Sequence, residues 1–306
     1  MTASYPGLGA LQQELASHQG CLRYGTSVQG RPLLAVELGG SGPRVLVTGG
    51  IHGVEWIGVA VAMEVLRRGP ISGARLLVCP VLNPDGVART ELTRGDAPVG
   101  ALRKNANGVD LNRNFPLPYG ARPRRVPFAG AMDLGSATYR GPAPLSEPES
   151  RSLMELLAGD PPHAAIDLHS FMGTFIAARV WHPSDWRGYS RLVRVGRRAG
   201  APYRRLGTPL FDVFTGELED WLHHGMGCWA VCMECFSVAE SLRQHLRAPT
   251  AFARFNPTDP GPIAARDAGA VRAMLRESLD LPRVPRREGA DRWVPWGPKG
   301  LLEGTG

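Results

Sequence analysis

The order of apolar and polar residues along the chain predicts strands that alternate with helices. Short apolar runs bounded by glycine, proline or asparagine predict strands at residues 31–38, 44–49, 75–82, 164–169 and 228–236. Apolar residues spaced three and four apart predict helices at 54–68, 147–157, 186–199, 216–224, 238–254 and 264–279. This alternation indicates an α/β fold in which helices cover both faces of a mixed sheet.

The connections between these elements contain turn signals and one long loop. Gly39 to Gly42 predicts a hairpin turn between the first two strands, and residues 83–86 (Asn-Pro-Asp-Gly) predict a turn after the third. Residues 87–146 are expected to be mostly loop, and a long ordered loop in a compact domain usually has a function. We expect one catalytic domain over residues 1–280 and a Pro-, Gly-, Arg- and Trp-rich tail over 281–306.

Composition limits the possible locations and partners. Hydrophobic residues make up 43% of the 306-residue chain, but none of the apolar runs reaches the length of a membrane span. The first twenty residues lack a basic start followed by an apolar stretch, which argues against a signal peptide. The five cysteines are an odd number without an export signal, so we expect reduced thiols in a cytoplasmic protein.

The formal net charge is +7, but the arginines are scattered along the chain. A basic balance can indicate nucleic acid, an anionic membrane or an acidic substrate. No nucleic-acid-binding module is recognisable. We therefore expect a solvated basic surface, with neither nucleic acid nor membrane as partner.

The first candidate for chemistry is the segment that contains His52 and Glu55. It follows a predicted strand, passes through a glycine-rich turn and enters a helix, which places both side chains at the carboxyl edge of the sheet. Imidazole and carboxylate are both zinc ligands, and two histidines with one glutamate form a known catalytic set. Taken alone, the spacing also fits a turn histidine beside a helix-capping glutamate.

Two further strands end in polar residues. His169 ends an apolar strand, where a histidine is otherwise a satisfied core residue, but a zinc site at this edge needs a third ligand. Glu234 lies inside the apolar strand at 228–236, and a buried carboxylate needs a partner, a metal or a raised pKa. It suits a general base acting on a metal-activated water, with a buried structural ion pair as the alternative.

The predicted loop carries groups that can bind an anion. Arginine grips carboxylates bidentately, so Arg113 with the neighbouring Asn112 can anchor a free carboxylate. Arg103 can stabilise an oxyanion. Asp110 can hold a zinc-bound histidine by accepting a hydrogen bond from its second ring nitrogen.

Taken in order, these segments resemble the zinc carboxypeptidases of the M14 type. The motifs are His52-x-x-Glu55, Arg103, Asp110-x-Asn112-Arg113, Thr138-Tyr139-Arg140-Gly141, Ser146-Glu147-Pro148-Glu149, His169 and Glu234, and the resemblance covers about residues 25–255. It implies an α/β/α sandwich around a mixed eight-stranded sheet. It also implies one zinc ion held by His52, Glu55 and His169, with Glu234 catalytic, Arg103 on the oxyanion, and Asn112 with Arg113 on the substrate's terminal carboxylate.

The segment before Asp220-Trp221 departs from the family pattern. Asp212 stands where the family usually has a mobile tyrosine, so the usual lid hydroxyl is missing. Glu219, just before Asp220-Trp221, matches the floor of the specificity pocket, where a carboxylate would favour a basic side chain. The alternative is that the loop is shifted and Glu219 is solvated.

The sequence leaves the substrate open. Hydrolysis of a peptide or amino-acid amide next to a free carboxylate is the main hypothesis; the alternatives are a small-molecule N-acyl amino acid deacylase and a murein-peptide peptidase that cuts before diaminopimelate. A catalytically dead binding module usually lacks a ligand or the glutamate, and this chain keeps all four. The Cys228-x3-Cys232-x2-Cys235 spacing of an iron–sulfur motif falls on a strand whose side chains alternate faces. The remaining histidines considered are expected at the surface: His163, His182, His223 and His224.

Overall fold

The computed structural model describes residues 4–118, 130–205, 215–285 and 293–294. Its main element is an eight-stranded sheet. In spatial order the strands are β1 (Cys21–Thr26), β2 (Pro32–Leu38), β4 (Arg75–Cys79), β3 (Arg44–Gly49), β6 (Ala164–Ser170), β9 (Trp229–Cys235), β7 (Thr174–Ala177) and β8 (Arg204–Arg205). The four strands β4, β3, β6 and β9 run parallel, whereas β2 and β7 lie antiparallel to their inner neighbours, so the sheet is mixed.

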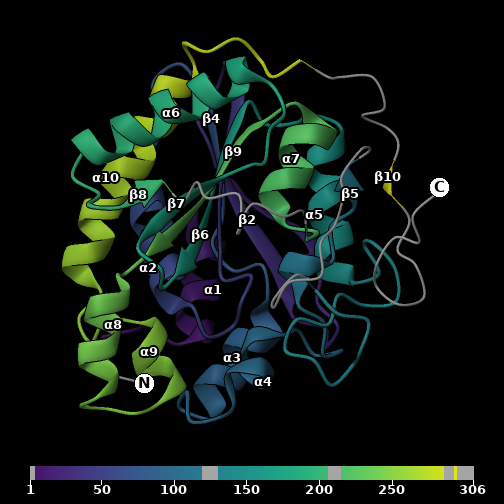
Figure 1. The fold of residues 1–306 in the computed structure, drawn as a ribbon, viewed down its shortest axis with the longest axis vertical. Coiled ribbons are helices and arrows are strands. Elements are labelled where there is room, and N and C mark those ends of the chain that lie inside the picture. Colours follow the sequence, from purple (N-terminus) through teal and green to yellow (C-terminus); the bar gives the residue numbers. More distant parts are fainter. Residues whose placement is uncertain (1–3, 119–129, 206–214, 286–292, 295–306) are drawn as a thin grey trace.

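Helices cover both faces of this sheet (Figure 1). One layer contains α2 (Trp56–Arg67), α6 (Pro183–Arg198) and α10 (Gly261–Ser278), and the other contains α5 (Pro148–Ala158) and α7 (Leu218–Met226). The remaining helices are α1 (Leu8–Ser17), α3 (Pro84–Leu92), α4 (Val99–Arg103), the 3-10 turn η1 (Leu111–Arg113), α8 (Val238–His245) and α9 (Ala251–Phe255). The predicted three-layer α/β/α fold is confirmed.

Alternation along β3 explains why two cores form. Val45 and Val47 pack in the cluster with α2 and α10, whereas Leu46 packs in the cluster with α5 and α7. Successive strand residues point to opposite faces, and here both faces are covered, so Val45, Leu46 and Val47 form an apolar run rather than alternating with polar residues. The same arrangement holds in β6, where all seven residues are buried.

The parallel strands end at one edge of the sheet, and this edge positions the site. The segments that follow β3 and β4, and the last residues of β6 and β9, all lie there. In open α/β sheets, ligands bind outside the carboxyl ends of the strands. Across the last parallel pair, His169 of β6 lies directly opposite Glu234 of β9.

The predicted hairpin between residues 31–38 and 44–49 is wrong, because β4 lies between β2 and β3. The glycines that predict a turn instead let the link cross the start of β4. Gly42 has a φ of +95°, and a Cβ there would lie 2.2 Å from the Gly73 carbonyl oxygen. Only glycine permits both the conformation and the close approach.

Other local expectations also need correction. Residues 83–86 begin α3 rather than forming a free turn, since the Asn83 side chain caps the helix by accepting from Gly86 N and Pro84 occupies its first turn. Residues 238–254 form two helices, α8 and α9, instead of one. The elements α1, β1, α4, β7 and β8 were not predicted, and α3 and α4 occupy part of the region 87–146 that was expected to be mostly loop. Within the described residues, no helix has the length and apolarity that crossing a bilayer requires.

Candidate metal centre and neighbouring charged cluster

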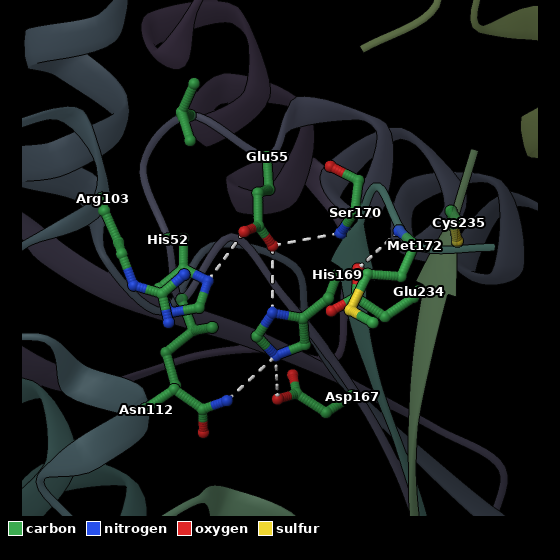
Figure 2. A network of polar contacts seen from close by, with 12 residues as sticks. His52, Glu55, Arg103, Asn112, Asp167, His169, Ser170, Met172, Glu234 and Cys235 are labelled. Atoms are coloured by element: carbon green, nitrogen blue, oxygen red, sulfur yellow. Dashed lines mark hydrogen bonds and ion pairs between the residues drawn. The ribbon is translucent and has the colours of Figure 1, made fainter. Parts of the chain in front are cut away.

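Three predicted metal ligands converge at the carboxyl edge of the sheet. His52 follows β3, Glu55 directly precedes α2, and His169 lies in β6. Figure 2 shows the Glu55 carboxylate between the two imidazole rings. Its Oε1 lies 2.8 Å from His52 Nδ1, its Oε2 lies 3.0 Å from His169 Nδ1, and Oε2 also accepts from Ser170 N at 3.1 Å. One carboxylate therefore joins both histidines.

The other nitrogen of each imidazole faces a second carboxylate. His52 Nε2 lies 3.1 Å from Asp110 Oδ1, and His169 Nε2 lies 2.7 Å from Asp167 Oδ2. The remaining oxygen of Asp167 accepts from Thr48 Oγ1 at 2.5 Å. A carboxylate at Nε2 fixes the orientation of each ring and directs Nδ1 toward Glu55.

Asp167 was not among the predicted site residues. It lies two residues before His169, and the signal was present, because an acid inside an apolar strand needs a partner. The same reasoning identified Glu234 but was not applied to β6.

The donor set fits a zinc ion. One donor atom from each of His52, Glu55 and His169 lies within 4.8 Å of the other two, and all three residues are buried. Two imidazoles and a carboxylate form a normal catalytic zinc set. Burial raises the pKa of Glu55, but the two histidines lower it by more, so its net pKa lies below the ordinary value. The ligand needed in ionised form is thus already held as an anion.

Glu234 lies beside this group with its side chain half-buried. Its Oε2 accepts from Met172 N at 3.2 Å (Figure 2). Burial and the neighbouring charge of Glu55 raise the pKa of Glu234 above its ordinary value. On the other side of the group, Arg103 Nε donates to Asp110 Oδ2 at 2.8 Å. A proton acceptor and a cation therefore flank the candidate metal ligands.

The predicted carboxylate anchor has internal partners. Asn112 Oδ1 accepts from Leu218 N at 2.9 Å, and its Nδ2 lies 3.4 Å from His169 Nε2. Arg113 Nη1 donates to the Asn112 carbonyl at 2.7 Å and lies 3.2 Å from Glu217 Oε1. These contacts tie η1 to the start of α7 and to the candidate metal centre.

A charged cluster surrounds the start of α7, and we call it the primed cluster. Its members are Arg113, Arg179, Glu217, Glu219 and Asp220. Glu219 is only 2% exposed, and its Oε2 has no hydrogen-bond partner within the described residues. Burial, then the charges of Glu217 and Asp220, raise the pKa of Glu219 well above its ordinary value. The alternative of a solvated Glu219 is therefore wrong, while Asp212 lies outside the described residues.

Two of the four histidines expected at the surface are buried. His223 lies 2.9 Å from Tyr189 Oη through Nδ1, and His163 Nε2 lies 2.8 Å from the Ser278 carbonyl oxygen. Both are satisfied by internal partners, so they are core residues. The five cysteines are all free. Cys235 packs in the core with α2 and α10, whereas the Cys232 Sγ lies within 4.8 Å of ligand atoms of His169 and Glu234, as expected for strand residues on opposite faces.

Comparison with known protein families identifies the family to which this chain belongs. The sequence matches the family described as zinc carboxypeptidase, Peptidase_M14, over residues 8–69 and 70–236. The chain belongs to the zinc carboxypeptidase family. This membership confirms the predicted family and its zinc cofactor, for which His52, Glu55 and His169 form the candidate site.

Several relatives within the zinc carboxypeptidase family are similar over half of the chain or more. Rat carboxypeptidase A2 is 25% identical over 60% of this chain and 46% of its own length. Murein peptide amidase A of Escherichia coli K12 is 32% identical over 55% of this chain and 66% of its own length. The chain spans about half the length of the first curated relatives that it matches.

Solved structures support the zinc carboxypeptidase fold. Carboxypeptidase A from Helicoverpa armigera superposes with a TM-score of 0.68 at 18% identity, covering 90% of this chain and 72% of that one. A structure of thrombin-activatable fibrinolysis inhibitor gives 0.71 at 17% identity, covering 91% and 75%. At such low identity the likeness concerns the fold alone.

Proposed function

We propose that this protein hydrolyses an amide bond next to a free carboxylate and releases a C-terminal residue with a basic side chain. The observation that carries the proposal is the position of Glu234 directly opposite His169, at the edge where the three candidate metal ligands meet. The carboxylate anchor Arg113 and the buried Glu219 belong to the neighbouring primed cluster. We include the predicted cytoplasmic location, since none of the five cysteines is in a disulfide.

The chain's own residues then have distinct roles. Zinc, when bound by His52, Glu55 and His169, supplies Lewis-acid chemistry and a water of lowered pKa. Glu234 takes a proton from water on a carboxylate oxygen and returns it to the leaving amine nitrogen. Arg103 contacts Asp110 through Nε, and its Nη groups would donate to the developing oxyanion.

Glu219 supports the preference for a basic leaving residue. Its carboxyl is buried, has a raised pKa and sits beside other acids, so it is protonated more readily than an ordinary glutamate. A lysine or arginine side chain placed against Glu219 would lower its pKa and favour the ionised form. Binding a basic residue would then release a proton, and the KM for basic peptides would fall as pH rises.

A digest of a mixed peptide pool tests the reaction. Zinc-loaded protein should remove single C-terminal residues, mainly lysine and arginine, and a chelator should stop the trimming. The Glu219→Ala variant should lose the preference for basic residues and keep activity on neutral ones. An unchanged preference in this variant would remove Glu219 from the proposal, and trimming that resists the chelator would contradict metal dependence.

A second candidate keeps the chemistry and changes the substrate to a murein peptide containing diaminopimelate. The observation that favours it is Arg179, a buried cation that contacts both Glu217 and Asp220 within the primed cluster. A cluster with both signs of charge suits a side chain that ends in an ammonium and a carboxylate. The 32% identity with murein peptide amidase A adds support. An untrimmed peptide pool together with cleavage of a diaminopimelate peptide would favour this candidate, whereas cleavage of N-acyl amino acids alone would indicate a deacylase.

A further inference from the structure

An internal carboxylate occupies the predicted anchor for the substrate's carboxylate. Glu217 Oε1 lies 3.2 Å from Arg113 Nη1, while its Oε2 contacts Arg179 Nη1. Arg179 Nη1 also contacts Asp220 Oδ2 at 2.6 Å. The side chains of Arg113, Glu217 and Arg179 are 9%, 13% and 7% exposed, so these charges interact with little screening by solvent.

The backbone holds Glu217 in this position. Leu218 N donates to Asn112 Oδ1, and Phe115 N donates to the Gly216 carbonyl oxygen at 3.1 Å. Gly216 has a φ of +90°, and a Cβ there would lie 2.6 Å from the Arg113 carbonyl oxygen. The segment before α7 is therefore packed directly on η1, and the contact between Glu217 and Arg113 follows from this packing.

Glu217 is ionised at neutral pH. Burial raises its pKa, but the charges of Arg179 and then Arg113 lower it by more, and the net pKa lies below the ordinary value. The guanidinium of Arg113 thus carries a fixed counter-charge. A substrate carboxylate that approaches Arg113 meets a cation whose field is already partly cancelled.

We propose that Glu217 is a specificity-determining residue that weakens the carboxylate anchor for neutral leaving residues and spares basic ones. A neutral side chain offers nothing to offset the repulsion between Glu217 and the substrate carboxylate. A cationic side chain near Glu217 and Glu219 does offset it, because its positive charge attracts the Glu217 carboxylate. This inference rests on the proposed function, since it concerns the same substrate site.

Binding to a zinc-loaded Glu234→Gln background tests the inference without turnover. Two N-acylated peptides of identical sequence, one ending in leucine and one in lysine, are titrated by calorimetry. In that background the lysine peptide should bind more tightly. Adding Glu217→Gln should tighten the leucine peptide about tenfold and change the lysine peptide by less than about twofold.

The matched comparison is Glu219→Gln in the same background, which should weaken the lysine peptide and should not reproduce the tenfold tightening of the leucine peptide. Glu217→Asp keeps the charge and should keep the original ratio of affinities. Damage to the pocket would weaken both peptides, so tighter binding cannot come from misfolding. Glu217→Ser provides a second neutral variant if the glutamine variant does not fold.

The outcomes separate the two proposals. Leucine-peptide binding that is unchanged or weaker in both neutral variants, with the lysine preference intact, contradicts the role of Glu217 alone. Failure of both peptides to bind even where Glu217 is intact contradicts the proposed function, and this inference with it.

Discussion

The candidate metal centre and the primed cluster lie side by side but are built differently. In the metal centre each imidazole nitrogen faces one carboxylate oxygen, from Glu55, Asp110 or Asp167. In the primed cluster Glu217 and Asp220 contact Arg113 or Arg179, and Glu219 Oε2 has no hydrogen-bond partner within the described residues. The metal centre pairs each of its imidazole nitrogens, whereas the primed cluster contains a buried carboxyl oxygen without a hydrogen-bond partner within the described residues.

This difference shows what each region is built to receive. A matched set of donors is preorganised for one metal ion and holds its geometry before the ion arrives. An unmatched buried carboxylate costs folding free energy, and a substrate cation can recover part of that cost on binding. Specificity is therefore expected to depend on the primed cluster, and catalysis on the metal centre.

The largest expected effect comes from Glu234, which lies opposite His169 beside the candidate metal ligands. Glu234→Gln keeps the shape of the side chain but cannot accept a proton. We expect kcat to fall about 10²–10⁴-fold, the usual contribution of general acid–base catalysis. Steady-state kinetics and zinc content measured on the same sample check this. Near-normal kcat at full zinc occupancy would show that another group accepts the proton.

The next largest effect concerns the contact between Asp167 and the candidate metal ligand His169. Asp167→Asn removes the charge behind His169 Nε2 but keeps a similar shape. We expect zinc affinity to fall about 10–100-fold, as for other residues that hold a metal-bound histidine. Competition with a chromogenic chelator measures this affinity.

Asp267→Asn is the control for that variant. Asp267 is also buried, but it accepts from Tyr203 Oη at 2.7 Å and from Arg266 Nε at 2.8 Å instead of contacting a candidate metal ligand. Zinc affinity should stay unchanged in this variant. An equal loss in both variants would indicate a general effect on stability rather than a role for Asp167 in the metal centre.

The sequence predicted the two regions to different extents. His52, Glu55 and His169 follow or end apolar strands, so their meeting at one sheet edge follows from parallel strand order. The order of the strands within the sheet was harder to predict from the sequence. The predicted hairpin between β2 and β3 is wrong, because β4 lies between them. Local glycine patterns predict a turn, but the pairing of β4 between these strands depends on long-range contacts.

The primed cluster could not be assembled from sequence because its partners are far apart along the chain. Arg179 follows β7, a strand that was not predicted, and its contacts with Glu217 and Asp220 span about forty residues. Glu219 was identified through the family resemblance, whereas its burial and lack of a partner depend on the packing of α7. Charge balance in a buried cluster depends on three-dimensional neighbours, which no local pattern encodes.

The smallest expected effect concerns the free energy of unfolding, which should increase when the buried acid Glu219 is replaced. Burial, then the charges of Glu217 and Asp220, raise the pKa of Glu219 well above its ordinary value. The folded protein therefore holds this proton to higher pH than the unfolded chain does. The folding free energy that Glu219 contributes is fully present below its ordinary pKa and is lost as pH rises through the raised one.

Glu219→Gln removes this titration and supplies an amide that can donate to the neighbouring carboxylates. We expect the variant to be more stable than the unmodified protein by about 1–3 kcal/mol at neutral pH, the usual cost of an unsatisfied buried polar group. Thermal unfolding from pH 4 to 8 checks this, and the advantage should shrink toward pH 4. A constant difference across this range would mean that the gain comes from packing. A loss of stability at pH 7 would mean that Glu219 is matched by a partner, and the contrast between the two regions would then fail.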